Sequence, residues 1–171
     1  MKFQKLLFGT AAACFMFGAS SAAIAEGCPG GIITLDSAST IRISDVSCTL
    51  IGISVDGSVI VTNSPSFTML GSVVNGKVVV IDGNNTAILD STVFGPAIRV
   101  VGAIGDVVLS NNIVTIGNIV ARDNVSASFP DDADSVLIYS NTVGGDIQCR
   151  NNEFELASKN IAGGEINCSG Q

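Results

Sequence analysis

The amino-acid sequence has no histidine and no tryptophan, and Tyr139 is its single tyrosine. Without histidine and without a Cys-x-x-Cys pair, the chain lacks the ligands from which zinc sites are usually built. Without tryptophan, it also lacks broad aromatic platforms on which sugar rings stack. These absences argue against a zinc centre and against an aromatic-lined sugar groove.

Basic residues are also scarce. The 171 residues include 8 lysines and arginines against 15 aspartates and glutamates, so the formal net charge is −7. No basic cluster occurs, which argues against nucleic acid and against an anionic membrane surface as partners. After residue 25, no segment reaches the roughly 18 to 20 continuous apolar residues that a membrane span needs.

The first 25 residues have the pattern of a secretory signal peptide. Two lysines precede an apolar run over residues 6–18, and Ala23–Ala25 places small residues at the cleavage site. We therefore expect an exported protein (periplasmic, secreted or at the cell surface) that begins near Glu26. A lipoprotein anchored at Cys14 is less favoured, because "AAAC" lacks the usual large aliphatic residue three positions earlier.

Removing this leader takes away two lysines and no acidic residue. The mature chain then has 6 basic and 15 acidic residues, 6 − 15 = −9, and its 171 − 25 = 146 residues suit one domain. Four cysteines remain in it. An even number in an oxidising compartment favours disulfides over thiol chemistry.

One sequence unit recurs along the chain, an apolar-x-apolar pattern just after a glycine. Its seven copies begin at residues 40, 58, 77, 97, 118, 146 and 165, with spacings of 18, 19, 20, 21, 28 and 19: TIRIS, SVIVT, KVVVI, AIRVV, NIVAR, DIQCR and EINCS. A glycine stands before most copies, and Gly95 with Pro96 precedes the fourth. We expect each unit to begin at a corner that needs glycine's backbone freedom.

A second strand-like run lies in the middle of the units, as in TLIGISV and DVVLSNNIV, and helix signals are absent outside the leader. Two or three short strands per repeat of about 20 residues predict an all-β fold, a single-stranded parallel β-helix of six to seven turns. We expect it to be right-handed, as parallel crossovers usually are. Residues 40–171 would form this domain, and residues 26–39 an N-terminal cap.

The apolar positions of the repeats predict two inward columns. The first comprises Ile41, Val59, Val78, Ile98, Ile119, Ile147 and Ile166. The second comprises Ile43, Val61, Val80, Val100, Ala121, Cys149 and Cys168. The position between them should point outward: Arg42, Ile60, Val79, Arg99, Val120, Gln148 and Asn167.

Three asparagines, Asn112, Asn141 and Asn160, fall at equivalent corners after the second strand. Asparagine tolerates left-handed backbone geometry, and its amide can bond to a stacked neighbour. We therefore expect an asparagine column at this corner.

The units LSNNIV, IYSNTVGGDIQC and LASKNIAGGEINC resemble the repeats of right-handed parallel β-helix proteins, both the pectate lyase-like superfamily and periplasmic copper-associated β-helix proteins. The resemblance covers roughly residue 40 to the C-terminus. It implies the architecture and export. It carries over no catalytic residue, so function must be argued from individual sites.

The cysteines form two pairs that each span about one turn. Cys28 and Cys48 are 20 residues apart, and Cys149 and Cys168 are 19 apart. Adjacent turns bring Cα atoms to about 4.8 Å, within the range of a disulfide. We expect two disulfides that staple the ends, where a turn has only one neighbour. Stacked free thiols are the alternative, and a metal or redox pair is disfavoured.

The longest repeat has extra residues within 122–135, RDNVSASFPDDADS. Insertions of this kind often carry function in solenoids. Asp131, Asp132 and Asp134, with Asp123 nearby, offer the oxygen ligands that Ca²⁺ prefers. We favour the simpler interpretation of a solvated acidic loop without a metal ion. An EF-hand is excluded because its required glycine and glutamate are missing.

Polysaccharide cleavage is a further hypothesis, because the resembled fold hosts it. A lyase of that class implies calcium-binding acids beside an arginine or lysine base, and Arg122 and Arg150 are the best-placed pair, in consecutive turns near the acidic loop. A glycosidase could use two of the aspartates. Hydrolases of that fold use a histidine, which this chain lacks.

We therefore expect an exported, non-catalytic β-helix with no cofactor and with a structural, surface or ligand-binding role, its faces available to a glycan or a surface protein. The alternative is a polysaccharide lyase-like protein that uses Asp131–Asp134 with Arg122 and Arg150. The sheet edges at the two ends also offer a route to self-association.

Overall fold

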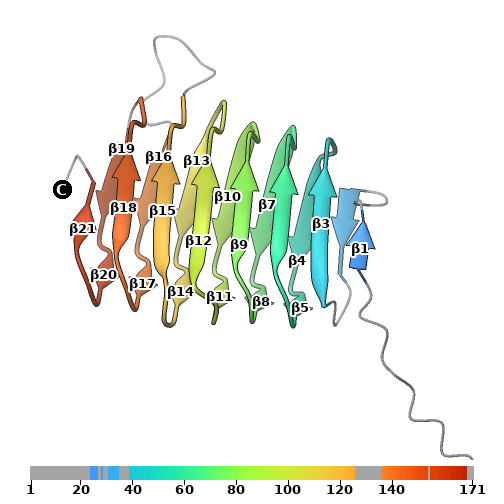
Figure 1. The fold of residues 1–171 in the computed structure, drawn as a ribbon, viewed down its shortest axis with the longest axis horizontal. Helices are drawn as coiled ribbons and strands as arrows, with labels where there is room; N and C mark the ends of the chain where they lie inside the picture. Colours follow the sequence, from blue (N-terminus) through green and yellow to red (C-terminus); the bar gives the residue numbers. More distant parts are fainter. Residues whose placement is uncertain are drawn as a thin grey trace, which may run out of the picture.

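The computed structural model shows an all-β molecule in which every strand runs parallel to its neighbours (Figure 1). The structure is described for residues 24–26 (backbone only), 28, 31–34, 39–125, 136–153 and 155–168. Within these residues there is no α-helix, and the strands form three sheets. The predicted parallel β-helix is therefore confirmed.

Each turn of the chain adds one strand to each sheet, and about six turns stack along the axis. The first sheet comprises β1 (Ile24–Glu26), β3 (Thr40–Ser44), β6 (Val59–Thr62), β9 (Val78–Ile81), β12 (Ala97–Val101), β15 (Asn118–Arg122), β18 (Ile147–Arg150) and β21 (Ile166–Asn167). The second comprises β2 (Ile32–Ile33), β4 (Cys48–Ile51), β7 (Ser66–Leu70), β10 (Asn85–Leu89), β13 (Val107–Ser110), β16 (Val136–Tyr139) and β19 (Glu155–Ser158). The third comprises β5 (Ser54–Val55), β8 (Val73–Val74), β11 (Thr92–Val93), β14 (Ile113–Val114), β17 (Thr142–Val143) and β20 (Ile161–Ala162).

Both predicted inward columns of the first sheet are confirmed by the strand register. The residues from Ile41 to Ile147 pair in succession and are all buried, as are those from Ile43 to Cys149. Ile166 and Cys168, in the last turn, are only partly buried. The residues between the columns are exposed or half-exposed, as the alternation predicts.

The second and third sheets close the core from the other two sides. One inward column of the second sheet is Leu50, Met69, Ile88, Leu109, Ile138 and Ala157, and the other is Cys48, Phe67, Thr86, Val107, Val136 and Glu155. The third sheet contributes Val55, Val74, Val93, Val114, Val143 and Ala162. Burial of these apolar side chains supplies the main driving force for folding. All three columns change in the last turn. Ala157 follows Ile138, Glu155 follows Val136, and Ala162 follows Val143.

The glycines before the first-sheet strands serve a different purpose from the one expected. Gly57, Gly76, Gly95 and Gly117 do not have the positive φ that favours glycine. Each one instead lies directly on the preceding turn: a β-carbon on Gly95 would overlap the carbonyl oxygen of Gly76, and one on Gly117 would overlap that of Pro96. Glycine is required at this corner because the stacked backbones approach too closely for a side chain.

Left-handed backbone occurs instead at the other two corners. One corner contains Asp45, Asn63, Asp82, Gly102, Asp123 and Asn151, and the other contains Gly52, Gly71, Asp90, Asn111, Ser140 and Lys159. The expectation that Asn112, Asn141 and Asn160 take this conformation is therefore wrong by one residue. Each of them follows the left-handed residue, and this step turns its side chain inward.

The predicted asparagine column is a ladder along the inside of this corner. Asn112 Nδ2 donates to Asn141 Oδ1, and Asn141 Nδ2 donates to Asn160 Oδ1, both at 3.0 Å. The backbone amides of Asn112 and Asn141 donate to the same two oxygens at 2.9 Å. Ser72 and Ser91 continue the ladder toward the N-terminus. The ladder satisfies backbone groups that the corner turns away from the sheets.

Two disulfides link the outermost turns, as predicted. Cys28 is joined to Cys48 with a Cα separation of 5.6 Å, and Cys149 to Cys168 with a separation of 4.8 Å. Residues 26–39, expected as a cap, contribute β2 to the second sheet. A covalent link at each end opposes the fraying of turns that have only one neighbour.

Gly95→Ala should lower the free energy of unfolding by about 2 kcal/mol, because the added methyl group has to displace the backbone of the turn beside it. Chemical denaturation measures this change. Gly71→Asn is the matched control, since Gly71 has φ +57° and open space around a β-carbon, and asparagine tolerates that backbone. The control should change stability by less than about 0.5 kcal/mol. Equal losses in both variants would contradict close approach as the reason for glycine.

Asn141→Leu should lower the free energy of unfolding by about 3 kcal/mol, because it leaves the Asn112 amide and the Leu109 carbonyl oxygen unpaired inside the core. Asn75→Leu is the control at the surface, where Asn75 donates to Asp56 at 3.3 Å. The control should stay within about 0.5 kcal/mol of the wild type. Thermal or urea unfolding measures both variants. Equal stability of Asn141→Leu and Asn75→Leu would show that the ladder does not stabilise the fold.

Candidate functional sites at one corner and at the C-terminal end

The structure brings three of the predicted site residues together at the corner between the first and second sheets. Arg122 ends β15 and Arg150 ends β18, and the two are register partners. Asp123 follows Arg122 in left-handed backbone. The predicted placement of the two arginines in consecutive turns is therefore confirmed.

The Asp123 carboxylate at this corner is already engaged by protein groups. One oxygen lies 3.0 Å from Nε of Arg122, and the other accepts a hydrogen bond from Nδ2 of Asn151 at 3.0 Å. The Arg122 and Asp123 side chains are 42% and 46% exposed, so their ion pair contributes little to stability. A cation bound at Asp123 would have to compete with Arg122.

The other candidate Ca²⁺ ligands, Asp131, Asp132 and Asp134, lie outside the described residues, as does the rest of the segment 126–135. Within the part of the chain that the structure describes, no group of three or more cysteine, aspartate or glutamate side chains is placed to hold a metal ion. The solvated acidic loop and the alternative of a calcium site both stay hypotheses from sequence.

A second asparagine pair lies directly inside this corner. Asn124 is fully buried and donates from Nδ2 to Asn152 Oδ1 at 2.8 Å. Asn152 in turn donates to the carbonyl oxygen of Ala121 and to the carboxylate of Glu155. We did not predict this pair, although the repeated Arg-Asp-Asn and Arg-Asn-Asn at 122–124 and 150–152 were a signal for it. The pair links the two turns that carry Arg122 and Arg150.

Tyr139 and Lys159 form a polar pair on the outer surface at the next corner. The ammonium of Lys159 donates to the phenolic oxygen of Tyr139 at 2.9 Å and lies 5.1 Å from the ring centroid. This hydrogen bond, helped by one from Ser140 and by the positive charge, lowers the pKa of Tyr139 below its usual 10.0. The same bond raises the pKa of Lys159. The one-turn separation of the two residues could have indicated this pair from the sequence.

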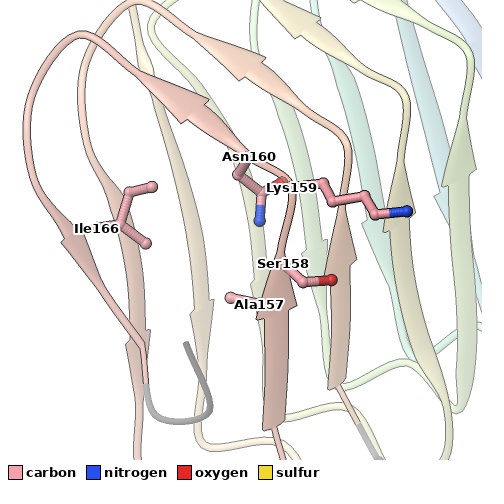
Figure 2. A pocket seen from close by; sticks show the side chains of 5 residues that line it. All are labelled: Ala157, Ser158, Lys159, Asn160 and Ile166. Carbon is pink, nitrogen blue, oxygen red and sulfur yellow. The ribbon is translucent and has the colours of Figure 1, made fainter.

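The C-terminal end of the stack is hollowed. A cavity of about 230 Å³ is lined by Ala157, Ser158, Lys159, Asn160 and Ile166. Figure 2 shows that Ile166 and Ala157 face each other across it, whereas Lys159 extends away toward the neighbouring turn. The cavity is therefore lined by alkyl groups and an amide, and its single titratable side chain points elsewhere.

Comparisons of the chain with protein families, with curated proteins and with solved structures find no match. The resemblance to pectate lyase-like repeats is thus supported at the level of the fold alone. No helix in the described residues is long and apolar enough to cross a membrane.

The described residues place different groups at the two locations. At the corner, the one carboxylate beside the arginines is bound to Arg122 and Asn151. At the end, the cavity lacks an acid and base that converge on one point.

The single tyrosine and the absence of tryptophan allow Tyr139 to be titrated by ultraviolet absorbance without interference. Tyrosinate should form at a lower pH than in a model peptide, because Lys159 stabilises the ionised phenol. Lys159→Met removes that donor and should move the midpoint upward. Lys77→Met, a change at a distant exposed lysine, should leave the midpoint in place. An unchanged midpoint in Lys159→Met would show that the pair does not form in solution.

Proposed function

We propose that this protein is an exported, non-catalytic β-helix that serves as a structural and binding module, presenting a flat outer face to a protein or glycan partner. The observation that carries the proposal is the outer surface of the third sheet. Its outward column, Ser54, Val73, Thr92, Ile113, Thr142 and Ile161, is formed by register partners and contains no charged residue.

Large apolar side chains are exposed along this face. Ile113 is 50% exposed and Ile161 is 67% exposed, and Phe94 and Ile116 are exposed beside them. We call these residues, together with Val73, the apolar strip. Along the column, Val73, Ile113 and Ile161 alternate with threonines. Exposed apolar residues gathered on one face in this way often mark a binding surface. On a chain with a net charge of −7, an uncharged face is the part suited to contact a partner.

Export is supported by the two disulfides. Bonds of this kind persist in oxidising compartments and are rare in a reducing cytosol. Both disulfides lie at the ends of the stack, where they preserve the outermost turns. This placement suits a protein whose work depends on a persistent shape outside the cell interior.

The alternative function is a polysaccharide lyase-like activity that uses Arg122 and Arg150 with Asp131–Asp134. The register pairing of the two arginines favours it. The engagement of Asp123 by Arg122 and Asn151 weighs against it, because a Ca²⁺ ion at this carboxylate would have to displace both partners. We therefore rank it second.

One experiment separates the two functions. The mature protein is incubated with acidic polysaccharides and Ca²⁺, and unsaturated product is followed by ultraviolet absorbance. We expect no product. Product formation that Arg150→Ala abolishes and Lys77→Ala leaves intact would overturn the non-catalytic proposal.

The binding role is tested on the same preparation by a glycan array and by pull-down from a cell-surface extract. The affinity for a bound partner should fall about tenfold or more in Ile113→Lys, because this change places a charge in the centre of the apolar strip. Ile81→Lys, at an exposed aliphatic position on the first sheet, is the matched control. A partner that binds both variants equally would locate the interaction away from the strip.

A further inference from the structure

All four arginines of the chain lie in one sheet. Arg42 is in β3, Arg99 in β12, Arg122 in β15 and Arg150 in β18, each at an outward position of the first sheet. The strands of this sheet from β3 to β21 contain no acidic residue. In the described strands of the second and third sheets, the single charged residue is Glu155, which occupies an inward column. Positive charge within the strands is therefore confined to the outer face of the first sheet.

Three of these arginines lie in consecutive strands, β12, β15 and β18 (Figure 1). Arg122 and Arg150 are register partners, and Arg99 pairs with Val120, two residues before Arg122. Register partners in neighbouring strands are about 4.8 Å apart, and a further two residues of rise bring the diagonal distance to about 8 Å. We call Arg99, Arg122 and Arg150 the arginine triad. Their long side chains can reach a common ligand.

The charges of the triad are only partly balanced by described residues. Like charges in register destabilise a sheet. Asp123 lies 3.0 Å from Nε of Arg122, but the residue after Arg150 is Asn151, whose amide donates to the same Asp123 carboxylate. Neither Arg99 nor Arg150 takes part in an ion pair with a described residue. Three guanidinium groups and one carboxylate leave 3 − 1 = 2 positive charges at this part of the face.

The acid that precedes Arg150 in the same turn is engaged by other groups. Asp146 accepts a hydrogen bond from Nε2 of Gln148 at 3.2 Å and another from the backbone amide of Glu165 at 3.0 Å. Both donors lie toward the start of β18 and β21, away from the end of β18 where Arg150 lies. Asp146 therefore does not balance the charge of Arg150.

Aliphatic side chains lie between the arginines. Val101 is the register partner of Arg122, and Val120 is the register partner of Arg99, so valine and arginine alternate over β12 and β15. Both valines are half-exposed. A ligand that fits this pattern has carboxylates, which guanidinium groups bind through two parallel N–H donors, and alkyl groups that cover the valines.

A polypeptide meets both requirements better than an acidic polysaccharide does. An extended peptide presents every second side chain on one face, which is also the interval between Val120 and Arg122. Acidic and aliphatic side chains can alternate along it. A chain of sugar rings has no alkyl side chains, and the strands β12, β15 and β18 contain no aromatic residue on which a ring could stack.

We propose that the arginine triad, together with Val101 and Val120, binds an extended acidic segment of a partner protein in which carboxylate and aliphatic side chains alternate. The site lies on a different sheet from the apolar strip and does not depend on it. The net charge of the chain, −7, opposes an acidic ligand. This repulsion is screened beyond about 8 Å at physiological ionic strength, whereas the triad acts at contact distance.

Fluorescence anisotropy with a labelled synthetic peptide of alternating glutamate and valine tests the site on the purified protein. We expect saturable binding at low ionic strength, and the affinity should fall as salt is added. The same peptide with glutamine in place of glutamate is the control probe and should not bind. Absence of saturable binding by the glutamate peptide, or equal binding by the glutamine peptide, would overturn the proposal.

Arg99→Gln and Arg150→Gln should each weaken binding of the glutamate peptide at least about fivefold, because each removes a guanidinium group that holds a carboxylate. Arg42→Gln is the matched control. It makes the same change of charge on the same face, three turns from Arg99, and should leave the affinity as in the wild type. Thermal unfolding establishes that all three variants are folded. An equal loss of affinity in Arg42→Gln would show that net charge, rather than the triad, determines binding.

Competition with polygalacturonate distinguishes a polypeptide from an acidic polysaccharide as the ligand. Polygalacturonate has one carboxylate on each sugar and no alkyl side chain. It should displace the labelled peptide only at a higher concentration of carboxylate groups than the unlabelled peptide requires. Displacement at an equal or lower concentration would overturn the choice of a polypeptide and assign the triad to a glycan.

Discussion

The contact of each turn's backbone with that of the next is the constraint on which the rest of this structure depends. At the glycine corner the approach is so close that a β-carbon on Gly76 or Gly95 would overlap the carbonyl group of the preceding turn. The in-register pairing of all three sheets follows from that spacing, and so does the stacking of like side chains into columns. Asparagine ladders belong to the same scheme, because an amide repeated at every turn can donate to its copy in the next. Shape, core and polar network thus follow from one repeated distance.

The left-handed backbone at the other two corners explains part of the acidic surface. Asp45, Asp82, Asp90 and Asp123 all occupy left-handed positions at the two corners other than the one formed by Gly57, Gly76, Gly95 and Gly117. Aspartate is among the few residues with a side chain that enter this conformation readily. Asp123 therefore has a backbone reason to be where it is, whatever its neighbours do. An acidic residue near two arginines is weaker evidence for a catalytic site in this fold than it would be in a fold without such corners.

Much of the fold was predictable from sequence, because a repeat reports its own geometry. The spacing of about 19 residues and the alternation in TIRIS and SVIVT specify the inward columns, and the same spacing places Cys149 beside Cys168. The glycine corner was located correctly but explained wrongly, since a single sequence does not distinguish a glycine with positive φ from one pressed against another backbone. The pair of Tyr139 and Lys159 was missed because it depends on how two long side chains reach between neighbouring turns, which the repeat alone does not specify. The acidic residues 131–134 lie where the period fails, so no neighbouring turn indicates their placement.

In a solenoid, each inner turn packs against a turn on both sides, whereas an outermost turn packs against one neighbour only. In this chain the last turn departs from the column pattern in two ways. Glu155 takes an inward position, and its carboxylate accepts a hydrogen bond from Asn152, which holds the charge against the asparagine pair. Ala157, Ala162 and Ile166 leave the remaining part of the end small and apolar. The last described turn therefore differs from the five before it in two ways, with a hydrogen-bonded charge in one inward column and smaller apolar residues in its neighbours.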